Sequence, residues 1–225
     1  MTHADETLSW RLSSVRGTAA ELHGLNVRDL TGDDRSITLC EVSRPAIVLG
    51  STQHDDDVDA HRAADLGVDV VRRRSGGGAV WLHPADSIWI DLWIPRGDRL
   101  WTDDVSGSMI FAGEAFVAAL DTVPRLAVWR NRFDAGEFGR RVCFASDAPG
   151  EVRGPEGKAV GISQRRDRSG ARLQCVLYRR WSPTEWSSVF VDDDVCRAVE
   201  MLTVTTVDIG TDVLVERLAA ALTPR

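Results

Sequence analysis

Three arginines, a serine and three glycines stand together from Arg72 to Gly78, and an apolar stretch containing tryptophans follows them. Consecutive glycines lose much backbone entropy on ordering, so they occur where backbone passes close to something or needs dihedral angles closed to other residues. Exposed N–H groups of such a loop, with the neighbouring guanidinium groups, could hold a carboxylate or a phosphate. The spacing matches neither a P-loop nor a dinucleotide-binding loop. A plain hairpin between residues 68–71 and 79–82, with solvated arginines, is the alternative.

A single lysine is the second feature that could take part in binding or catalysis. Lys158 is the only lysine among the 27 basic residues, and it begins the largely apolar segment 158–163. The small residues around it, Gly157, Ala159 and Gly161, would let a ligand approach the ammonium group. A binding or catalytic lysine is therefore one interpretation, and a solvated loop lysine is the other.

These two segments resemble the lipoate-protein ligase A family, which includes related octanoyltransferases. Residues 72–80 look like its R-R-x-S-G-G-G-A-V signature, and residues 157–166 resemble its G-K-K-[ILV]-x-G-[ST]-A-Q-R-R segment. The similarity covers roughly residues 8 to 222, with both motifs in the family's order. The resemblance implies the catalytic fold shared by biotin and lipoate ligases, which is related to class II synthetases. It also implies an apolar tunnel for a lipoyl or octanoyl group.

The resemblance implies roles for particular residues. Lys158 matches the lysine that contacts the oxygens of an acyl-adenylate, where a fixed cation stabilises developing negative charge. The substrate-binding candidates are Arg73, Ser75, Gly76, Gly77, Gly78, Ala79, His83 and Gly161, and the cofactor-binding candidates are Arg72 and Glu151. The implied cofactors are ATP and Mg²⁺. The implied partners are lipoyl carrier domains of 2-oxoacid dehydrogenases or the H-type protein of glycine cleavage, with lipoate or octanoyl acyl carrier protein as donor.

The chain departs from the ligase pattern at three places. His83 and Asp86 stand where a His-Asp and an Asn usually follow the glycines. Gly150-Glu151 stands where the family has an Asn-Asp pair associated with nucleotide and magnesium, so a carboxylate survives and the amide is lost. A His-Gly pair is replaced by Cys175 and Val176.

The function that the resemblance implies is a ligase that attaches a lipoyl or octanoyl group to a carrier-domain lysine through an acyl-adenylate. The departures bring forward an ATP-independent octanoyltransferase as the alternative. In some such enzymes a nucleophilic Cys-Phe pair stands eight residues before a glutamate and fifteen before the lysine, and Cys143, Glu151 and Lys158 reproduce that spacing. A thiolate beside an ammonium group would have a lowered pKa and would attack a thioester. Cys143 is otherwise a small buried hydrophobe, and Cys175 is expected to face the core. A non-catalytic acyl-binding homologue is the third interpretation.

Composition limits the remaining possibilities. The 225 residues, 43% of them hydrophobic, predict a single domain over residues 1–225 without a C-terminal accessory domain. A net charge of -7 argues against a nucleic-acid partner. The first thirty residues have neither a leader pattern nor a membrane-spanning run, and the four cysteines form no C-x-x-C pair. A cytoplasmic protein with reduced thiols, no membrane partner and no dedicated metal site is expected.

The hydrophobic pattern predicts an α+β domain on a mixed, mainly antiparallel sheet flanked by helices. Strands are expected at residues 37–42, 46–49, 68–71, 87–94, 127–129, 142–145, 159–163 and 172–178. Helices are expected at residues 13–25, 54–67, 106–120, 195–202 and 213–222. Residues 147–157, rich in glycine, proline and charge, are expected to form a mobile loop that closes over the acyl head group.

Overall fold

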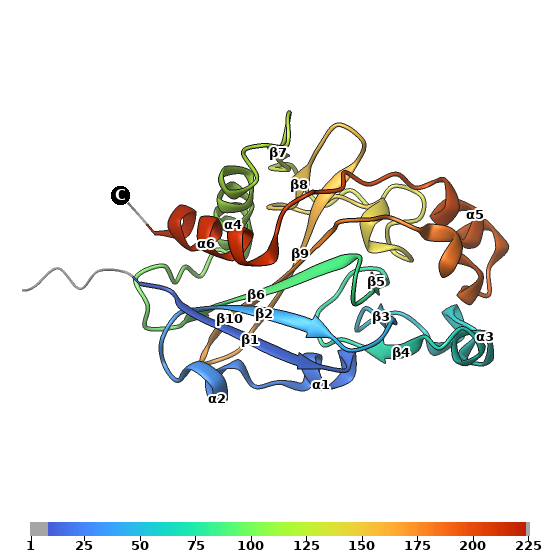
Figure 1. Ribbon diagram of the computed structural model, residues 1–225, viewed down its shortest axis with the longest axis horizontal. Helices are drawn as coiled ribbons and strands as arrows, with labels where there is room; N and C mark the ends of the chain where they lie inside the picture. The colour runs from blue at the N-terminus through green and yellow to red at the C-terminus, as the bar shows by residue number, and fades with distance from the viewer. Residues whose placement is uncertain (1–8, 224–225) are drawn as a thin grey trace, which may run out of the picture.

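The computed structural model describes residues 9–223 and is built on a seven-stranded sheet with the order β1-β2-β6-β10-β9-β8-β7 (Figure 1). Its strands are β1 (Arg11–Gly17), β2 (Ser36–Val42), β6 (Ser87–Pro95), β7 (Ala127–Val128), β8 (Val152–Arg153), β9 (Lys158–Arg166) and β10 (Gly170–Tyr178). Only β1 and β2 are parallel neighbours in this sheet. The predicted α+β class with a mainly antiparallel sheet is confirmed.

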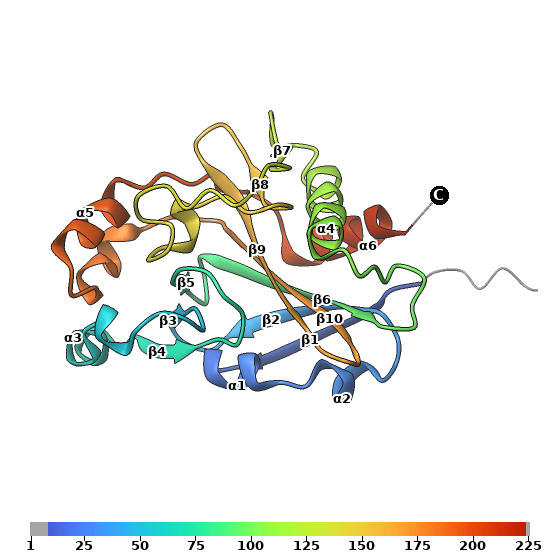
Figure 2. The same ribbon diagram turned by 180° about the vertical axis from the view of Figure 1, so that it is seen from behind.

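A second sheet of three strands, in the order β4-β3-β5, lies beside the first (Figure 2). It contains β3 (Ala46–Leu49), β4 (Asp69–Arg72) and β5 (Val80–Leu82). β4 and β5 flank β3 on opposite sides and do not pair with each other. The hairpin alternative is therefore wrong, because the arginine and glycine segment instead crosses from one edge of this sheet to the other.

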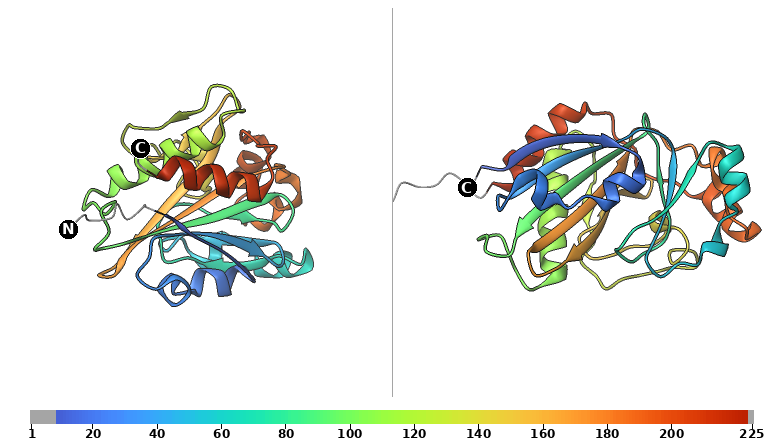
Figure 3. Two further views of the ribbon diagram at one scale, coloured as in Figure 1. Left: turned by 60° about the vertical axis from the view of Figure 1, so that its left-hand side comes forward. Right: turned by 90° about the horizontal axis from the view of Figure 1, so that it is seen from below.

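Two helices, α4 (Val105–Ala119) and α6 (Thr211–Leu222), pack against each other over one face of the large sheet (Figure 3). α6 presents Leu214, Leu218 and Leu222, spaced by four residues, to this core. On the sheet side, alternate residues of β6 and β10 supply the apolar surface: Ile88, Ile90, Leu92, Ile94, Leu173, Cys175 and Leu177. Cys175 is fully buried there, so its predicted core position is confirmed.

The remaining helices are short: α1 (Ala19–Gly24), α2 (Val27–Thr31), α3 (Ala60–Asp65) and α5 (Asp193–Met201). The helix expected at residues 13–25 is wrong in its first half, where β1 pairs with β2. Thr18 and Glu21 form a capping box, which fixes the start of α1 after the strand. The helix expected at 54–67 is shorter, because Asp59 caps its start at Ala60. None of the helices described is long and apolar enough to cross a membrane.

Residues 142–157 correct two further expectations. Cys143–Ala145 forms a 3-10 turn in place of a strand. The segment expected to be a mobile lid contains β8, which pairs with β7 on one side and β9 on the other. Its tip is also tied down, because Gly154 N donates to Gly157 O at 2.8 Å and Glu156 N donates to Thr205 Oγ1 at 3.1 Å. The segment is an integrated hairpin, and the lid prediction is wrong.

A polar row crosses the large sheet on the face opposite α4 and α6. The register places these residues side by side on neighbouring strands: Ser163, Gln174, Asp91, Thr38 and Ser13. At its centre, Arg172 Nε donates to Asp91 Oδ2 at 2.8 Å, and both side chains are buried. Arg172 also donates to the carbonyl oxygens of Leu22 (2.8 Å) and Leu25 (3.1 Å). This buried ion pair therefore anchors the end of α1 to the sheet.

We expect Asp91→Ala to lower the free energy of unfolding by about 3–5 kcal/mol, because it leaves the Arg172 guanidinium buried without its carboxylate. The matched control is Asp69→Ala, which breaks the ion pair between Asp69 and Arg44. This pair is more exposed, with 58% of the Arg44 side chain and 24% of the Asp69 side chain accessible to solvent. That change should cost less than about 1 kcal/mol. Urea unfolding of both variants checks this, and equal losses would contradict the assigned role of the buried pair.

Candidate active site

The glycine-rich loop is organised around the buried side chain of Arg73. Its guanidinium donates to Val48 O at 3.1 Å and, through Nη2, to the carbonyl oxygens of Gly76 and Gly78 at 2.8 Å each. Gly77 has a φ of +101°, which glycine adopts readily. A Cβ on Gly78 would lie 2.6 Å from Val142 N, so this position admits no side chain. The glycines thus allow backbone to pack directly against backbone.

The backbone packed against this loop leads to Cys143. Ala79 N donates to Arg141 O at 2.9 Å, and Cys143 N donates to Ala79 O at 2.9 Å. The two segments therefore run together, although they are 64 residues apart in the chain. This pairing fixes the position of the Cys143 thiol relative to Arg73.

Lys158 lies at the start of β9 with its side chain fully buried, so the solvated-loop interpretation is wrong. Its Nζ is 2.6 Å from Glu151 Oε2 and donates to Cys143 O at 2.7 Å. The ammonium also lies 5.4 Å from the centroid of the Phe144 ring. The structure therefore brings together Cys143, Glu151 and Lys158, three residues grouped by their spacing in the sequence.

Both carboxylate oxygens of Glu151 also accept hydrogen bonds from backbone N–H groups. Ala148 N donates to its Oε2 at 2.7 Å, and Ile162 N donates to its Oε1 at 3.3 Å. Burial raises the pKa of the Glu151 carboxyl, and the Lys158 ammonium and these hydrogen bonds oppose that rise. The Lys158 ammonium therefore favours the charged form of the buried Glu151 carboxyl.

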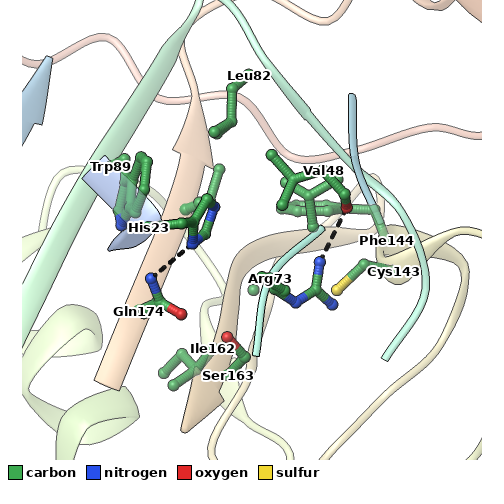
Figure 4. Close-up of a pocket in the computed structure, with 13 residues that line it drawn as sticks. His23, Val48, Arg73, Leu82, Trp89, Cys143, Phe144, Ile162, Ser163 and Gln174 are labelled. Atoms are coloured by element: carbon green, nitrogen blue, oxygen red, sulfur yellow. Dashed lines mark hydrogen bonds between the residues drawn. The ribbon is translucent and has the colours of Figure 1, made fainter. Parts of the chain in front are cut away.

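A pocket of about 390 Å³, part of it open to solvent, lies beside these residues (Figure 4). Arg73, Cys143 and Gly161 belong to its lining, as does Ser163, whose Oγ is 3.2 Å from Ser75 Oγ. The rest of the lining is mostly apolar: Val48, Val80, Leu82, Trp89, Phe144, Ile162 and Val176, with His23 and Gln174 added. This lining suits a small molecule with an apolar body.

Several predicted site residues lie outside the pocket lining. Gly76, Gly77, Gly78 and Ala79 belong to the loop around Arg73 and do not line the pocket, and Ser75 contacts the lining residue Ser163.

Arg72 and His83 lie farther away. Arg72 donates to the carbonyl oxygens of Gly50 (2.8 Å) and Gln53 (2.6 Å) and pairs with Asp55, so its guanidinium is occupied by the preceding loop. His83 lies outside the pocket lining, with Nδ1 3.1 Å from Asp86 Oδ2. The structure does not bring either residue to the pocket.

His23 and Gln174 line the pocket and were absent from the predicted site. Gln174 could have been found, because the core-facing alternation of Leu173, Cys175 and Leu177 sends residue 174 to the opposite face of β10. His23 follows from no comparable signal. It reaches the pocket from α1 because Arg172 anchors the neighbouring backbone.

The carboxylate next to Lys158 is not free to bind magnesium. Among the described residues, Glu151 is the carboxylate paired with Lys158, and both of its oxygens are already engaged. The described side chains place one cluster of potential metal ligands within 4.8 Å of one another, formed by His83, Asp86 and Glu185. Arg180 already binds both of these carboxylates, at 2.7 and 3.0 Å. Mg²⁺ binds through carboxylate oxygens, and both oxygens of Glu151 are already used.

Burial raises the pKa of the Cys143 thiol above its usual value. The Lys158 ammonium and the Arg73 guanidinium oppose this rise, and the Glu151 carboxylate adds to it. The expectation of a lowered pKa is therefore wrong for the free protein, because removal from water outweighs the neighbouring cations.

The rate of Cys143 alkylation by iodoacetamide should consequently keep rising with pH beyond pH 9, by about tenfold per unit below the thiol pKa. Peptide mapping separates this thiol from the others, and fully buried Cys175 serves as the unreactive control. A rate that levels off below pH 8 would contradict the raised pKa.

The arrangement of the two sheets and their helices is the fold found in solved lipoate and biotin ligases. The lipoyl protein ligase A/B catalytic domain family matches residues 25–221, and the chain belongs to this family. At the level of sequence alone, no curated protein matches the chain.

Three of the solved structures that match illustrate the shared fold. Protein Ta0514 of T. acidophilum, solved with bound lipoic acid, has a TM-score of 0.71 and 16% identity, with 95% of this chain and 83% of that chain covered. A bi-partite lipoate protein ligase from Thermoplasma acidophilum, described with its E2 lipoyl domain, has a TM-score of 0.68 and 16% identity over 95% and 82%. Lipoate-protein ligase A bound with ATP has a TM-score of 0.69 and 16% identity over 95% and 83%.

Proposed function

We propose that this protein transfers a medium-chain acyl group, lipoyl or octanoyl, from a thioester donor to a carrier-domain lysine by way of Cys143. The observation that carries the proposal is the position of the thiol. Cys143 lines the apolar pocket, and its own carbonyl is bound by the buried Lys158 ammonium at 2.7 Å. A nucleophile, a fixed cation and an apolar tail pocket thus meet at one point.

The reaction proceeds in two balanced steps. In the first, the Cys143 thiolate attacks the donor's thioester carbonyl, the bond to the donor sulfur breaks, and the donor thiolate leaves and takes up the proton released from Cys143. In the second, a neutral carrier lysine amine attacks the acyl-Cys143 carbonyl. An amide forms, the C–S bond breaks, and the amine proton returns to Cys143. No external oxidant, reductant or nucleotide is consumed.

The cations near Cys143 act on the charge that develops during both steps. A tetrahedral intermediate places negative charge on the former carbonyl oxygen, and Lys158 and Arg73 are the positive groups that influence the Cys143 thiol. Their positions are fixed before the reaction by Glu151 and by the loop carbonyls. Such preorganised charges stabilise a transition state without reorganisation. A Cβ at Gly161 would lie 3.1 Å from the Phe144 ring, so a larger residue there would displace part of the pocket lining.

The acceptor in this proposal is a lipoyl carrier domain of a 2-oxoacid dehydrogenase or an H-type protein, and the donor is octanoyl acyl carrier protein. The relative described with its E2 lipoyl domain supports a carrier-domain partner. We place the reaction in the cytoplasm, where the four free cysteines would remain reduced.

An ATP-dependent ligase is the second candidate, and the relative bound with ATP favours it. Two reactions separate the candidates. Octanoyl acyl carrier protein without ATP should add one octanoyl group to an apo lipoyl domain, measured by intact mass. Free octanoate or lipoate with ATP and Mg²⁺ should add none. The reverse result would replace the transferase by the ligase, and no modification in either reaction would indicate a non-catalytic acyl-binding protein.

A further inference from the structure

The pocket has polar groups on two opposite sides. Figure 4 shows Arg73 and Cys143 on one side and His23 with Gln174 on the other, and Val48, Leu82 and Phe144 belong to the apolar lining. In the proposed function the acyl carbonyl lies at Cys143. The tail of the acyl group therefore extends toward His23 and Gln174.

These two side chains bind each other and keep hydrogen-bonding capacity to spare. Gln174 is 8% exposed, and its Nε2 lies 3.1 Å from His23 Nδ1. Within residues 9–223, neither Gln174 Oε1 nor His23 Nε2 has a hydrogen-bond partner. Because the amide N–H donates to Nδ1, the ring proton of a neutral His23 stands on Nε2. An N–H donor and a carbonyl acceptor are thus left free at the edge of the pocket.

The imidazole is held in this state. Burial, together with the Arg172 and Arg73 guanidinium groups, lowers the pKa of His23 to about 3, so the ring is neutral near pH 7. Its centroid lies 4.4 Å from that of the Trp89 ring. Arg172 binds the carbonyls of Leu22 and Leu25 on either side of His23. The donor and the acceptor are therefore fixed before a ligand arrives.

We propose that His23 and Gln174 bind a hydroxyl in the distal part of the acyl group, so that the pocket, which accepts the plain octanoyl chain, takes a hydroxylated medium chain more tightly. The proposal rests on the proposed function, because it assumes that the acyl carbonyl lies at Cys143. A hydroxyl accepts from His23 Nε2–H and donates to Gln174 Oε1. A saturated tail would cover both atoms and leave them without partners, which is costly for buried polar groups.

Calorimetry with the purified full chain tests this directly. The probes are octanoate and two hydroxyoctanoates, with the hydroxyl on the terminal or the penultimate carbon. One hydroxyoctanoate should bind about tenfold more tightly than octanoate. The two test variants are Gln174→Met and His23→Phe, and the second keeps an aromatic ring next to Trp89. In both, the ratio of the octanoate Kd to the hydroxyoctanoate Kd should fall to about one, because the hydroxy acid binds more weakly.

Gln164→Met is the matched control, because Gln164 lies on the neighbouring strand and donates to Ser108 Oγ at 2.6 Å, outside the pocket lining. It should keep the tenfold ratio. Equal or tighter binding of octanoate by the unmodified chain overturns the proposal, as does a preference that survives both pocket variants. If octanoate binds equally well and is still transferred, only this inference fails. If no probe binds, this inference fails, and the transfer reaction with octanoyl acyl carrier protein decides the proposed function separately.

Discussion

Replacing Lys158 by alanine should lower the free energy of unfolding and also stop acyl transfer. The change leaves the Glu151 carboxylate fully buried without its 2.6 Å partner. Removing one member of a buried ion pair costs about 3–5 kcal/mol, and removing a fixed cation beside a developing oxyanion costs about a hundredfold or more in turnover. Urea unfolding and the carrier-domain transfer assay measure the two effects.

The pH dependence of this variant identifies Glu151 as the cause. Burial already raises the Glu151 pKa, and loss of the Lys158 ammonium removes the largest opposing influence. The folded variant then binds a proton that the unfolded chain has released, so its stability should fall as pH rises from 5 to 8. The double variant Lys158→Met with Glu151→Gln removes both charges and should recover most of the stability without recovering transfer. A Lys158→Ala protein as stable and as active as the parent would contradict both roles.

Replacing Cys143 by serine should abolish transfer while preserving the pocket. The hydroxyl is nearly the same size, but it is a poor nucleophile without an adjacent general base. Transfer from octanoyl acyl carrier protein should fall by about a thousandfold, and octanoate binding should change by less than about twofold. Cys196→Ser is the control, because Cys196 lies on α5 and is absent from the pocket lining. Normal transfer by Cys143→Ser would show that the acyl group never passes through this sulfur.

Much of the framework followed from hydrophobic periodicity. Ile88, Ile90, Leu92 and Ile94 alternate along β6, and the spacing of Leu214, Leu218 and Leu222 gives α6 one apolar face. Errors arose where local pattern was ambiguous. Residues 11–17 form a strand because β2 supplies a hydrogen-bonding partner, which periodicity within a single segment does not reveal.

The candidate site was predictable in part for a physical reason. Cys143, Glu151 and Lys158 lie within 16 consecutive residues, so a short hairpin is enough to bring them together. His23 and Gln174 are 151 residues apart and meet only through the packing of α1 on the sheet. The raised pKa of the Cys143 thiol could not be predicted from the sequence either. Burial is its largest cause, and burial depends on the completed fold.

The passage of the acyl group through Cys143 is tested most directly by the mass of the protein itself. The full chain is incubated with octanoyl acyl carrier protein in the absence of ATP and of any acceptor, and its intact mass is measured before and after hydroxylamine. We predict the gain of one octanoyl group, mapped to the Cys143 peptide and removed by hydroxylamine. An unmodified protein that nevertheless acylates a lipoyl domain, or an adduct on another residue, would contradict the account.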